Sequence, residues 1–409
     1  MGLGGPRAWL ISLVPQGVAN GLASLLVPLF LLTGLKGTVS EVGILAGASA
    51  LALMPSTIFW GWLVDRSWGC KPLLILSFVG TGATLLLIPY SHSFYQLFAL
   101  VTVKSVLFAA SMPSRQILTV ESESHATWQG GLARLAFFEG LGETAGLGLG
   151  FLFSGAGLGA LFELCGVLAL SSAAGAAVLV REPAIMIERK LLGVERFVHT
   201  LSAASTVVAN PRAFSSSQDV AKVRRLFRPT TTFFLLGAFT FSLAAAALYS
   251  PLPAYFLRYY PSSSIFLLFF ANTTADTAAY LLVPGVSRNA GRSLVLASAV
   301  RMLAMPVLLF QGGEPGFVAS MTALAIMGGF WALFDVAGTT MFMGTARAGR
   351  AGLYGAIAGL GSGLGSILGG LISMGLGFGA LFAFCALLYA ATTVFFVAQF
   401  RAGTSRILR

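Results

Sequence analysis

Ionisable side chains stand inside long apolar runs of this 409-residue sequence. A charged group near the middle of a bilayer costs about 2.5–3.5 kcal/mol on insertion scales, so such a residue is a functional candidate by default. Carboxylates in that setting can take up and release protons, and basic groups can pair with them or tune them. The residues concerned are Lys104, Glu139, Glu143, Asp276, Arg301 and Asp335.

Two of these carboxylates share one face of a predicted helix. Glu139 and Glu143 are four residues apart, so their side chains are neighbours on a helix and repel each other. This repulsion favours a protonated form of one of them. We expect Glu139 or Glu143 to be a proton-coupling group that Lys104 tunes. The alternative is a permanently ionised bridge between Lys104 and Glu143, and the sequence does not rank the two acids.

Uncharged polar and aromatic residues continue the same helix faces. Gln16 and Asn20 share one face, Phe108 and Ser111 extend the Lys104 face, and Trp331, Asp335 and Thr339 share another. A wall of mixed aromatic and polar character suits a small, amphiphilic organic solute. We therefore predict a substrate cavity lined by these residues. Arg115, at the end of the Lys104 face, is interpreted as an anchor at the inner membrane surface, with a gate charge as the alternative.

The composition indicates which elements must position these residues. The chain is 56% hydrophobic and 10% charged, against about 25% charged in an average soluble domain, and its mean hydropathy is +0.86. A membrane-spanning helix needs about 20 apolar residues, and the unbroken apolar runs do not resemble the short alternating segments of a β-barrel. The sequence predicts an all-α membrane protein with spans at 8–33, 39–64, 71–90, 95–118, 130–153, 158–180, 229–256, 263–284, 292–311, 316–343, 351–373 and 379–400.

The distribution of lysine and arginine predicts the orientation. If both termini are cytoplasmic, 21 of the 25 basic residues fall on the inner side, and only Lys36 and Arg258 lie in outer loops. Inner loops of membrane proteins carry this excess. The net charge of +11 is therefore attributed to topology in the cell membrane, and no nucleic-acid partner is expected.

The chain divides into two sets of six spans. We expect one bundle at residues 1–180 and another at 229–400, followed by a basic cytoplasmic tail at 401–409. The polar linker at 181–228 carries apolar residues between its charges, which favours an amphipathic helix on the inner membrane surface. A plain solvated connector is the alternative.

The two sets resemble each other in sequence. Residues 159–165, GALFELC, match residues 379–385, GALFAFC, at a shift of 220. A second match, of 140–142 with 359–361, lies at a shift of 219. Such a repeat predicts two pseudo-symmetric six-helix bundles around a central cavity.

A loop between the second and third spans carries a family resemblance. The segment with Gly61, Asp65, Arg66, Gly69 and Lys71 resembles the loop motif of the major facilitator superfamily, with one extra residue before its second glycine. The resemblance extends over the whole chain through the number of spans, the central loop and the inner termini. A second-half copy retains Arg288 and Arg292 but has Ser287 in the position of the acid.

The resemblance implies roles for the spans. In the family, spans 1, 4, 7 and 10 line the cavity, spans 2, 5, 8 and 11 form the side walls, and the loop packs against span 11 and latches the halves together. Lys104 and Asp335 would then face the cavity. Asp276 would stand beside Glu139 and Glu143 near the seam between spans 5 and 8, as a third proton-coupling candidate. Arg301, on a supporting span, is expected to be a structural partner of Asp276, and the protein is expected to be a monomer.

Glycines at four-residue spacing mark two of the wall spans. Small residues at this spacing allow helix backbones to approach closely, and a hinge role is the alternative. The candidate helix-packing glycines are Gly142, Gly146, Gly150, Gly361, Gly365 and Gly369.

These features favour a secondary active transporter that moves a small organic solute by alternating access, as a symporter or antiporter coupled to protons or sodium. A non-transporting receptor or scaffold with the same fold is the alternative, and a membrane-embedded enzyme is less favoured. The sequence has three histidines, all outside the predicted spans, and it lacks a His-Glu-x-x-His motif and a phosphate-binding loop. We expect no metal, no cofactor and no disulfide among the three widely spaced cysteines.

Overall fold

The computed structural model describes residues 8–64, 69–121, 128–180, 229–286, 290–345 and 351–404, and within these ranges the chain is helical and has no strand. Several expectations lie outside the described residues. They concern Asp65, Arg66, Arg288, the linker at 181–228 and the end of the tail.

The first six spans are built from ordered helices with short irregular extensions. They are η1 (Ala8–Ser12), α1 (Leu13–Leu29), the π-helical turn η2 (Phe30–Gly34), α2 (Val39–Leu63), α3 (Cys70–Leu87), η4 (Ile88–Tyr90), α4 (Phe94–Phe108), α5 (Ser111–Glu121), α6 (Trp128–Leu152), η6 (Ser154–Ala156) and α7 (Leu158–Leu179).

The second six spans repeat this pattern. They are α10 (Pro229–Tyr249), α11 (Leu252–Phe256), α12 (Ser262–Val286), α13 (Ala290–Ala304), η8 (Pro306–Leu309), α14 (Gly313–Thr345), α15 (Ala351–Gly375) and α16 (Phe378–Thr404).

Eleven of the described helical segments are long and apolar enough to cross a membrane. The remaining predicted span is α6, which has 25 residues and lies within the bundle. Glu139, Glu143 and several glycines reduce its hydropathy, and burial between neighbouring helices is what such a sequence requires. The polar character of α6 thus reflects its position between the two halves.

Local sequence signals set where these helices begin. Thr38 caps α2 in a capping box, in which its backbone N–H donates to Glu41 at 2.6 Å and its side chain accepts from the Glu41 N–H. Gly157 and Gly377 precede α7 and α16 at φ values of +87° and +85°. Gly377 corresponds to Gly157 at the shift of 220 that relates the two halves. Only glycine adopts this positive-φ conformation readily. The sequence repeat is therefore also a repeat of backbone geometry.

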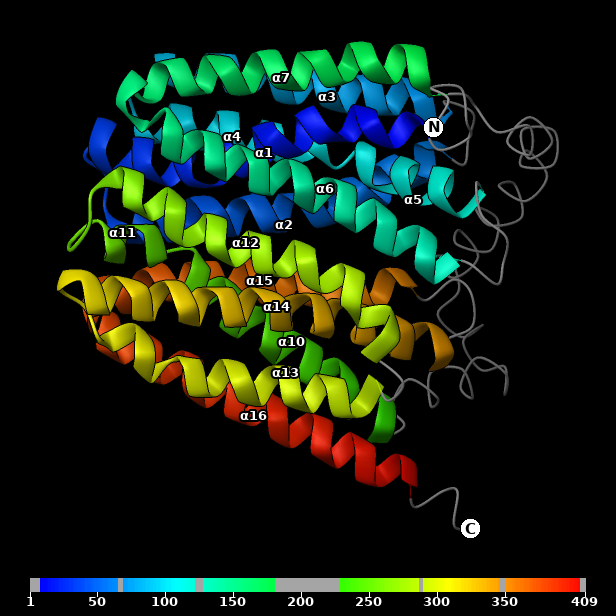
Figure 1. Cartoon of the computed structure of the whole chain (residues 1–409). Coiled ribbons are helices and arrows are strands. Elements are labelled where there is room, and N and C mark those ends of the chain that lie inside the picture. Colours follow the sequence, from blue (N-terminus) through cyan, green and yellow to red (C-terminus); the bar gives the residue numbers. More distant parts are fainter. Residues whose placement is uncertain are drawn as a thin grey trace, which may run out of the picture.

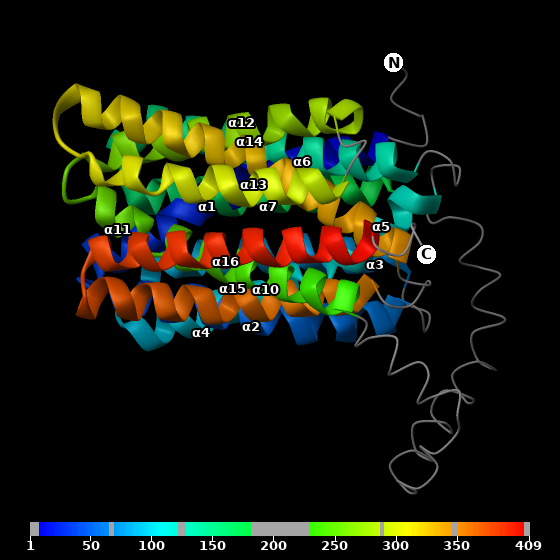
Figure 2. The ribbon, with the colours of Figure 1, turned by 90° about the horizontal axis from the view of Figure 1, so that it is seen from below.

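The two sets of spans lie side by side (Figure 1). We call the end of the bundle at which the described chain starts and stops the terminal end, and the opposite end the far end. Figure 2 shows the helices of both halves running along one common direction. Helix α15 packs against α10, and the main contacts between the halves are made by α2 with α15 and by α6 with α12. These pairs are the wall spans that the family resemblance implies.

The seam between α2 and α15 is packed through glycines near the far end. A methyl group added at Gly43 would lie 2.7 Å from the Cα atom of Gly370, closer than side chains tolerate. Toward the terminal end the contact loosens, because a methyl group at Gly359 would meet only the Met54 side chain, at 3.7 Å, and one at Gly355 would meet nothing within 4 Å. The two helices therefore diverge from the far end toward the terminal end.

The seam between α6 and α12 is closed along much of its length. A methyl group at Gly140 would lie 2.5 Å from the Thr277 hydroxyl, and one at Gly148 would lie 3.3 Å from the Phe270 ring. The hydroxyls of Thr144 and Thr277 form a 3.3 Å hydrogen bond across this seam. Small residues and one polar contact thus hold the halves together on this side.

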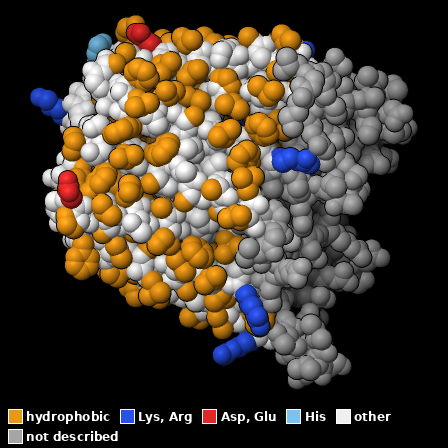
Figure 3. Space-filling view, viewed as in Figure 1, with side chains coloured by type: hydrophobic (Ala, Val, Ile, Leu, Met, Phe, Trp, Pro, Cys, Tyr) orange, Lys and Arg blue, Asp and Glu red, His pale blue; other side chains and the backbone are white. Residues whose placement is uncertain are grey.

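The outer surface is apolar between two charged ends. Figure 3 shows hydrophobic side chains spread over one face of the helices, with the charged ones toward its two ends. Large exposed residues of this kind include Leu282, Leu303, Val178 and Leu387. A contiguous apolar surface on this scale suits contact with lipid.

We expect Gly370→Ala to destabilise the protein because the added methyl group meets the Gly43 backbone at 2.8 Å. Overpacking of this kind costs about 1–3 kcal/mol. The matched control is Gly355→Ala on the same helix, where the space is open and where replacing glycine favours a helix. Thermal unfolding of the purified variants compares them, and equal melting temperatures would contradict the packing described.

Candidate functional site: two cavities and the charges around them

A cavity of about 420 Å³ lies between the two halves. Helices α1, α2 and α4 contribute its first-half wall, and α10, α11, α12 and α15 its second-half wall. Aromatic side chains of Tyr249 and Phe269 pack edge to face, with centroids 6.3 Å apart, on the second-half side. We call this space the central cavity.

Lys104 lines the central cavity and is half-buried. Among the residues that the structure describes, none forms a hydrogen bond or an ion pair with it. The bridge to Glu143 that the sequence left open does not form, since Glu143 lines a different cavity.

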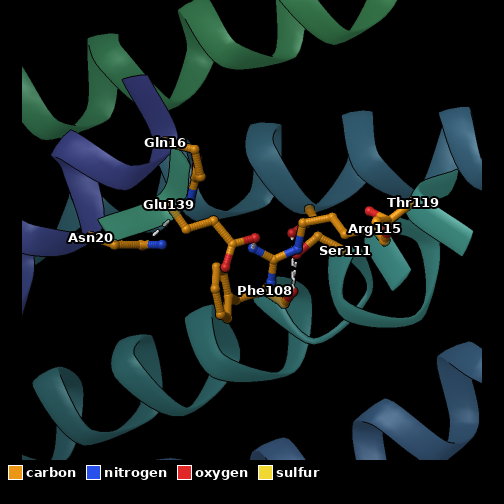
Figure 4. A network of polar contacts seen from close by, with 8 residues as sticks. Gln16, Asn20, Phe108, Ser111, Arg115, Thr119 and Glu139 are labelled. Atoms are coloured by element: carbon orange, nitrogen blue, oxygen red, sulfur yellow. Dashed lines mark hydrogen bonds and ion pairs between the residues drawn. The ribbon is translucent and has the colours of Figure 1, made fainter. Parts of the chain in front are cut away.

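That second cavity is small, about 30 Å³, and lies within the first half. Gln16 and Asn20 line it together with Phe108, as Figure 4 shows. The amide N–H of Gln16 donates to Asn20 at 3.4 Å, while the buried Gln16 carbonyl oxygen has no described partner. We call this space the first-half cavity.

Arg115 and Glu139 form an ion pair beside the first-half cavity. Arg115 Nη1 donates to Glu139 Oε1 at 2.5 Å, and the guanidinium lies 5.2 Å from the Phe108 ring centroid (Figure 4). Arg115 is almost fully buried. The interpretation of this residue as a surface anchor is therefore wrong, and it is an interior partner of Glu139.

A break in the fourth span explains the difference. Helix α4 ends at Phe108 and α5 begins at Ser111, with Pro113 in the first turn of α5. A proline lacks the N–H that would continue the helix. The sequence predicts one straight span, whereas the break comes between Phe108, at the end of α4, and Arg115 on α5. Lys104 lines the central cavity, and both Phe108 and Arg115 line the first-half cavity. Ser111 donates back to the Phe108 carbonyl at 2.8 Å.

Glu143 is half-buried and lines the first-half cavity. In the described ranges it has no ion-pair partner and no hydrogen-bond donor. The sequence could not rank Glu139 and Glu143. In the described structure Glu139 is paired with Arg115, and Glu143 has no such partner.

Arg301 is surrounded by aromatic rings in the second half. Its guanidinium donates to the Tyr389 hydroxyl at 3.0 Å and to the Met327 carbonyl at 2.6 Å. Its Cζ atom lies 5.2 Å from the ring centroids of both Phe241 and Trp331, within the range of cation–π attraction. Within the described part of the chain it forms no salt bridge with Asp276 at 4.0 Å or less, and the two opposite charges attract each other over a longer distance.

Asp276 and Asp335 occupy neighbouring helices near the α6–α12 seam. The Tyr280 hydroxyl donates to Asp335 Oδ2 at 3.1 Å. Asp276 Oδ1 is buried and has no hydrogen-bond partner among the described residues. One acid on this side is therefore partnered, and the other is incompletely satisfied.

The structure does not bring the predicted cavity residues into one site. Gln16, Asn20 and Phe108 meet at the first-half cavity, and Lys104 lines the central one. Trp331, Asp335 and Thr339 on α14 are half-buried, and neither cavity includes them.

The glycine rows pack helices within each half. A methyl group at Gly142 would lie 2.5 Å from the Val14 carbonyl on α1, and one at Gly361 would lie 2.6 Å from the Phe239 carbonyl on α10. Gly146, Gly365 and Gly369 make the same kind of backbone contact. Gly150 differs, because it faces Phe266 on α12, across the seam.

The described part of the loop motif brackets α2 and α3. Gly61 lies near Pro113 of α5, with 3.9 Å between an added methyl group and the proline Cβ. Gly69 caps α3 at φ +75°, Lys71 stands in the first turn of that helix, and Arg292 stands in the first turn of α13.

Sequence reasoning missed Tyr249, Phe269 and the seam glycines Gly43 and Gly370. A signal existed for two of them. Tyr249 precedes Pro251 and the break between α10 and α11, and broken helices often line binding sites in transporters. Gly43 has a second glycine four residues later, the spacing that permits close helix contact.

No group of three His, Cys, Asp or Glu side chains that could hold a metal ion occurs in the described ranges. Cys70, Cys165 and Cys385 are buried free thiols.

We expect Arg115 and Glu139 to be energetically coupled. Arg115→Gln should destabilise the protein because it leaves Glu139 without a cation, and Glu139→Gln in the same chain should relieve part of that loss. Contacting residues typically couple by about 0.5–3 kcal/mol. A double-mutant cycle on unfolding in detergent measures the coupling, and strictly additive effects would contradict the ion pair.

The comparisons with known proteins agree with this arrangement. A model of the Major Facilitator Superfamily matches residues 9–352. The structure resembles that of the nucleoside transporter NupG, with a TM-score of 0.69 and 13% identity over 97% of this chain and 98% of that one. It also resembles tetrameric PepTSo2, with a TM-score of 0.71 and 14% identity over 98% and 99% of the chains. At these identities the likeness is one of fold, and no curated protein matches the sequence.

The family model covers most of the chain, and the helical architecture is that of the solved transporters. The chain belongs to the Major Facilitator Superfamily, and it is a multi-pass membrane transporter rather than an enzyme.

Proposed function

We propose that the protein is a secondary active transporter that moves a small organic solute by alternating access, driven by protons. The observation that carries this proposal is the central cavity, which is lined by helices of both halves. A solute bound between two bodies gains or loses contacts when the bodies rock, so binding and movement are coupled. We assign the bodies to residues 1–180 and 229–400.

The shape of the α2–α15 seam supports a rocking movement. Backbone contact at Gly43 and Gly370 closes it near the far end, while the same two helices are loosely packed at Gly355. A pivot around the tight contact would open one end as the other closes. In this proposal the structure represents a state that is closed at the far end.

The unpaired state of Glu143 supports its role in proton coupling. An ionised carboxylate without a partner is costly in apolar surroundings, and binding a proton removes that cost. Glu139, in contrast, is already paired with the Arg115 guanidinium at 2.5 Å. We therefore assign the coupling proton to Glu143, with Asp276 as a second acceptor across the seam.

The excess of basic residues on one side supports an orientation in the cell membrane with both termini cytoplasmic. The far end, which includes the exposed Lys36, would then face the outside. We expect the protein to act as a monomer, because the central cavity is formed within one chain.

Glu143→Gln should abolish solute accumulation driven by a pH gradient while leaving solute exchange across the membrane intact. The amide resembles the protonated acid but cannot release a proton, so the halves can still move and only the coupling is lost. The measurement uses proteoliposomes, with uptake compared in the presence and absence of a pH gradient and during counterflow.

Glu163→Gln is the matched control, because Glu163 is exposed on α7 and lies in neither cavity. It should behave as the wild type. Full proton-driven accumulation by Glu143→Gln would exclude Glu143 from the coupling role, and failure of the wild type to transport any solute would contradict the transporter proposal.

A cysteine introduced by Lys36→Cys should react from outside the cell with a membrane-impermeant maleimide. The three native thiols are buried and should not react with the maleimide. Labelling only after the membrane is permeabilised would reverse the proposed orientation.

A further inference from the structure

We propose that the central cavity selects an organic anion, namely a solute with one negatively charged head group and an apolar body. The inference rests on the proposed transport function and specifies its substrate class. It follows from which groups line the cavity, which of them lack partners, and what lies behind its wall.

The charge of the lining is one-sided. Lys104 is the only charged residue among the described residues that line the central cavity. The carboxylates Glu139 and Glu143 lie away from it, around the first-half cavity. A solute in the central cavity therefore meets a single cation and no carboxylate.

Two serine hydroxyls of the lining already have partners. Ser24 donates to the Gly21 carbonyl at 2.7 Å, and Ser49 donates to the Leu45 carbonyl at 2.7 Å. Both are satisfied by the backbone of their own helix. Lys104, in contrast, is a charged lining group with no hydrogen-bond or ion-pair partner in the described part of the structure.

An unpaired ammonium group in a largely apolar space is costly. A bound carboxylate would supply the missing partner through a charge-assisted hydrogen bond. Pairing with a carboxylate removes the unfavourable free energy of the unpaired Lys104 ammonium. A neutral amide or a cationic amine does not remove it, so the cavity binds the anion more tightly.

The opposite wall strengthens the preference. The Tyr249 hydroxyl accepts a hydrogen bond from the Asn272 amide N–H at 3.0 Å, which leaves its own O–H as a donor. Behind the ring, the Arg301 guanidinium lies 5.8 Å from the Tyr249 centroid. A second buried cation therefore adds positive potential from the second half, without lining the cavity itself.

The remaining lining fits an apolar body. Val42, Leu45, Val101 and Phe269 contribute hydrocarbon and aromatic surface. The volume of about 420 Å³ lies within the range of pockets that bind small organic ligands. An aryl or alkyl monocarboxylate combines both features.

The test compares matched head groups on the full-length protein in lipid nanodiscs. The probes are 4-phenylbutyrate and octanoate, their neutral amides, and the corresponding amines 4-phenylbutylamine and octylamine, with empty nanodiscs to correct for partition into lipid. We expect at least one carboxylate to bind about tenfold more tightly than its amide, equivalent to about 1.4 kcal/mol, and we expect no stabilisation by the amines. Binding is measured as the rise in melting temperature with ligand concentration.

Variants of Lys104 provide the second arm. Lys104→Gln should remove the preference for the carboxylate and should not lower the melting temperature of the free protein, because it deletes an unpaired charge. Lys104→Arg should keep the preference. Lys36→Gln changes an exposed lysine outside both cavities in the same way and should have no effect.

The proposal would be overturned by equal binding of an amide or amine, by unchanged carboxylate binding in Lys104→Gln, or by the failure of both carboxylates to bind. Proteoliposomes separate this inference from the transport proposal. Proton-driven uptake of an amide or amine would support the transport proposal and contradict the anion site. Carboxylate binding that depends on Lys104, without any proton-driven uptake, would support the anion site and contradict the transport proposal.

Discussion

The low dielectric constant of the membrane interior is the constraint on which this structure depends. A charge there must find a partner or remain at a high energetic cost. The described charges follow two patterns. Arg115 is bound to Glu139, and Arg301 is held by two hydrogen bonds and a set of aromatic rings. Lys104 and Glu143, in contrast, stand at cavities without partners. The first pattern satisfies charges inside each half, and the second leaves two ionisable groups at cavity walls without a described partner.

Glycine residues form close helix contacts at two kinds of interface, one within each half and one between the halves. Within each half, the row that includes Gly142 and the row that includes Gly361 bring a wall helix onto α1 or α10. Between the halves, Gly43 meets Gly370 at one end of a seam that loosens toward the other. Close backbone contact without interlocking side chains holds two helices together while leaving few obstacles to a change of angle. Close packing within each half and a seam that loosens toward one end therefore arise from one residue type in different positions.

The helical architecture could be predicted because it depends on properties of short sequence segments, each of which can be read independently of the others. Hydrophobic length placed the spans, basic residues placed the loops, and the match between residues 159–165 and 379–385 indicated the duplication. The pairing of charges was not predictable in the same way. The partner of Arg115 depends on the break before Ser111, and that of Arg301 depends on rings from several helices that only the tertiary fold assembles. The sequence therefore identified which charges lie in the membrane but not how they are matched.

The aromatic enclosure of Arg301 has an electrical consequence. A guanidinium keeps its proton in proteins under all ordinary conditions, and this one is screened from water by Phe241, Trp331 and Tyr389. Its positive charge in the second half is therefore independent of ambient acidity. The neighbouring Asp276 and Tyr249 therefore lie in a positive potential that a change of ambient acidity does not remove.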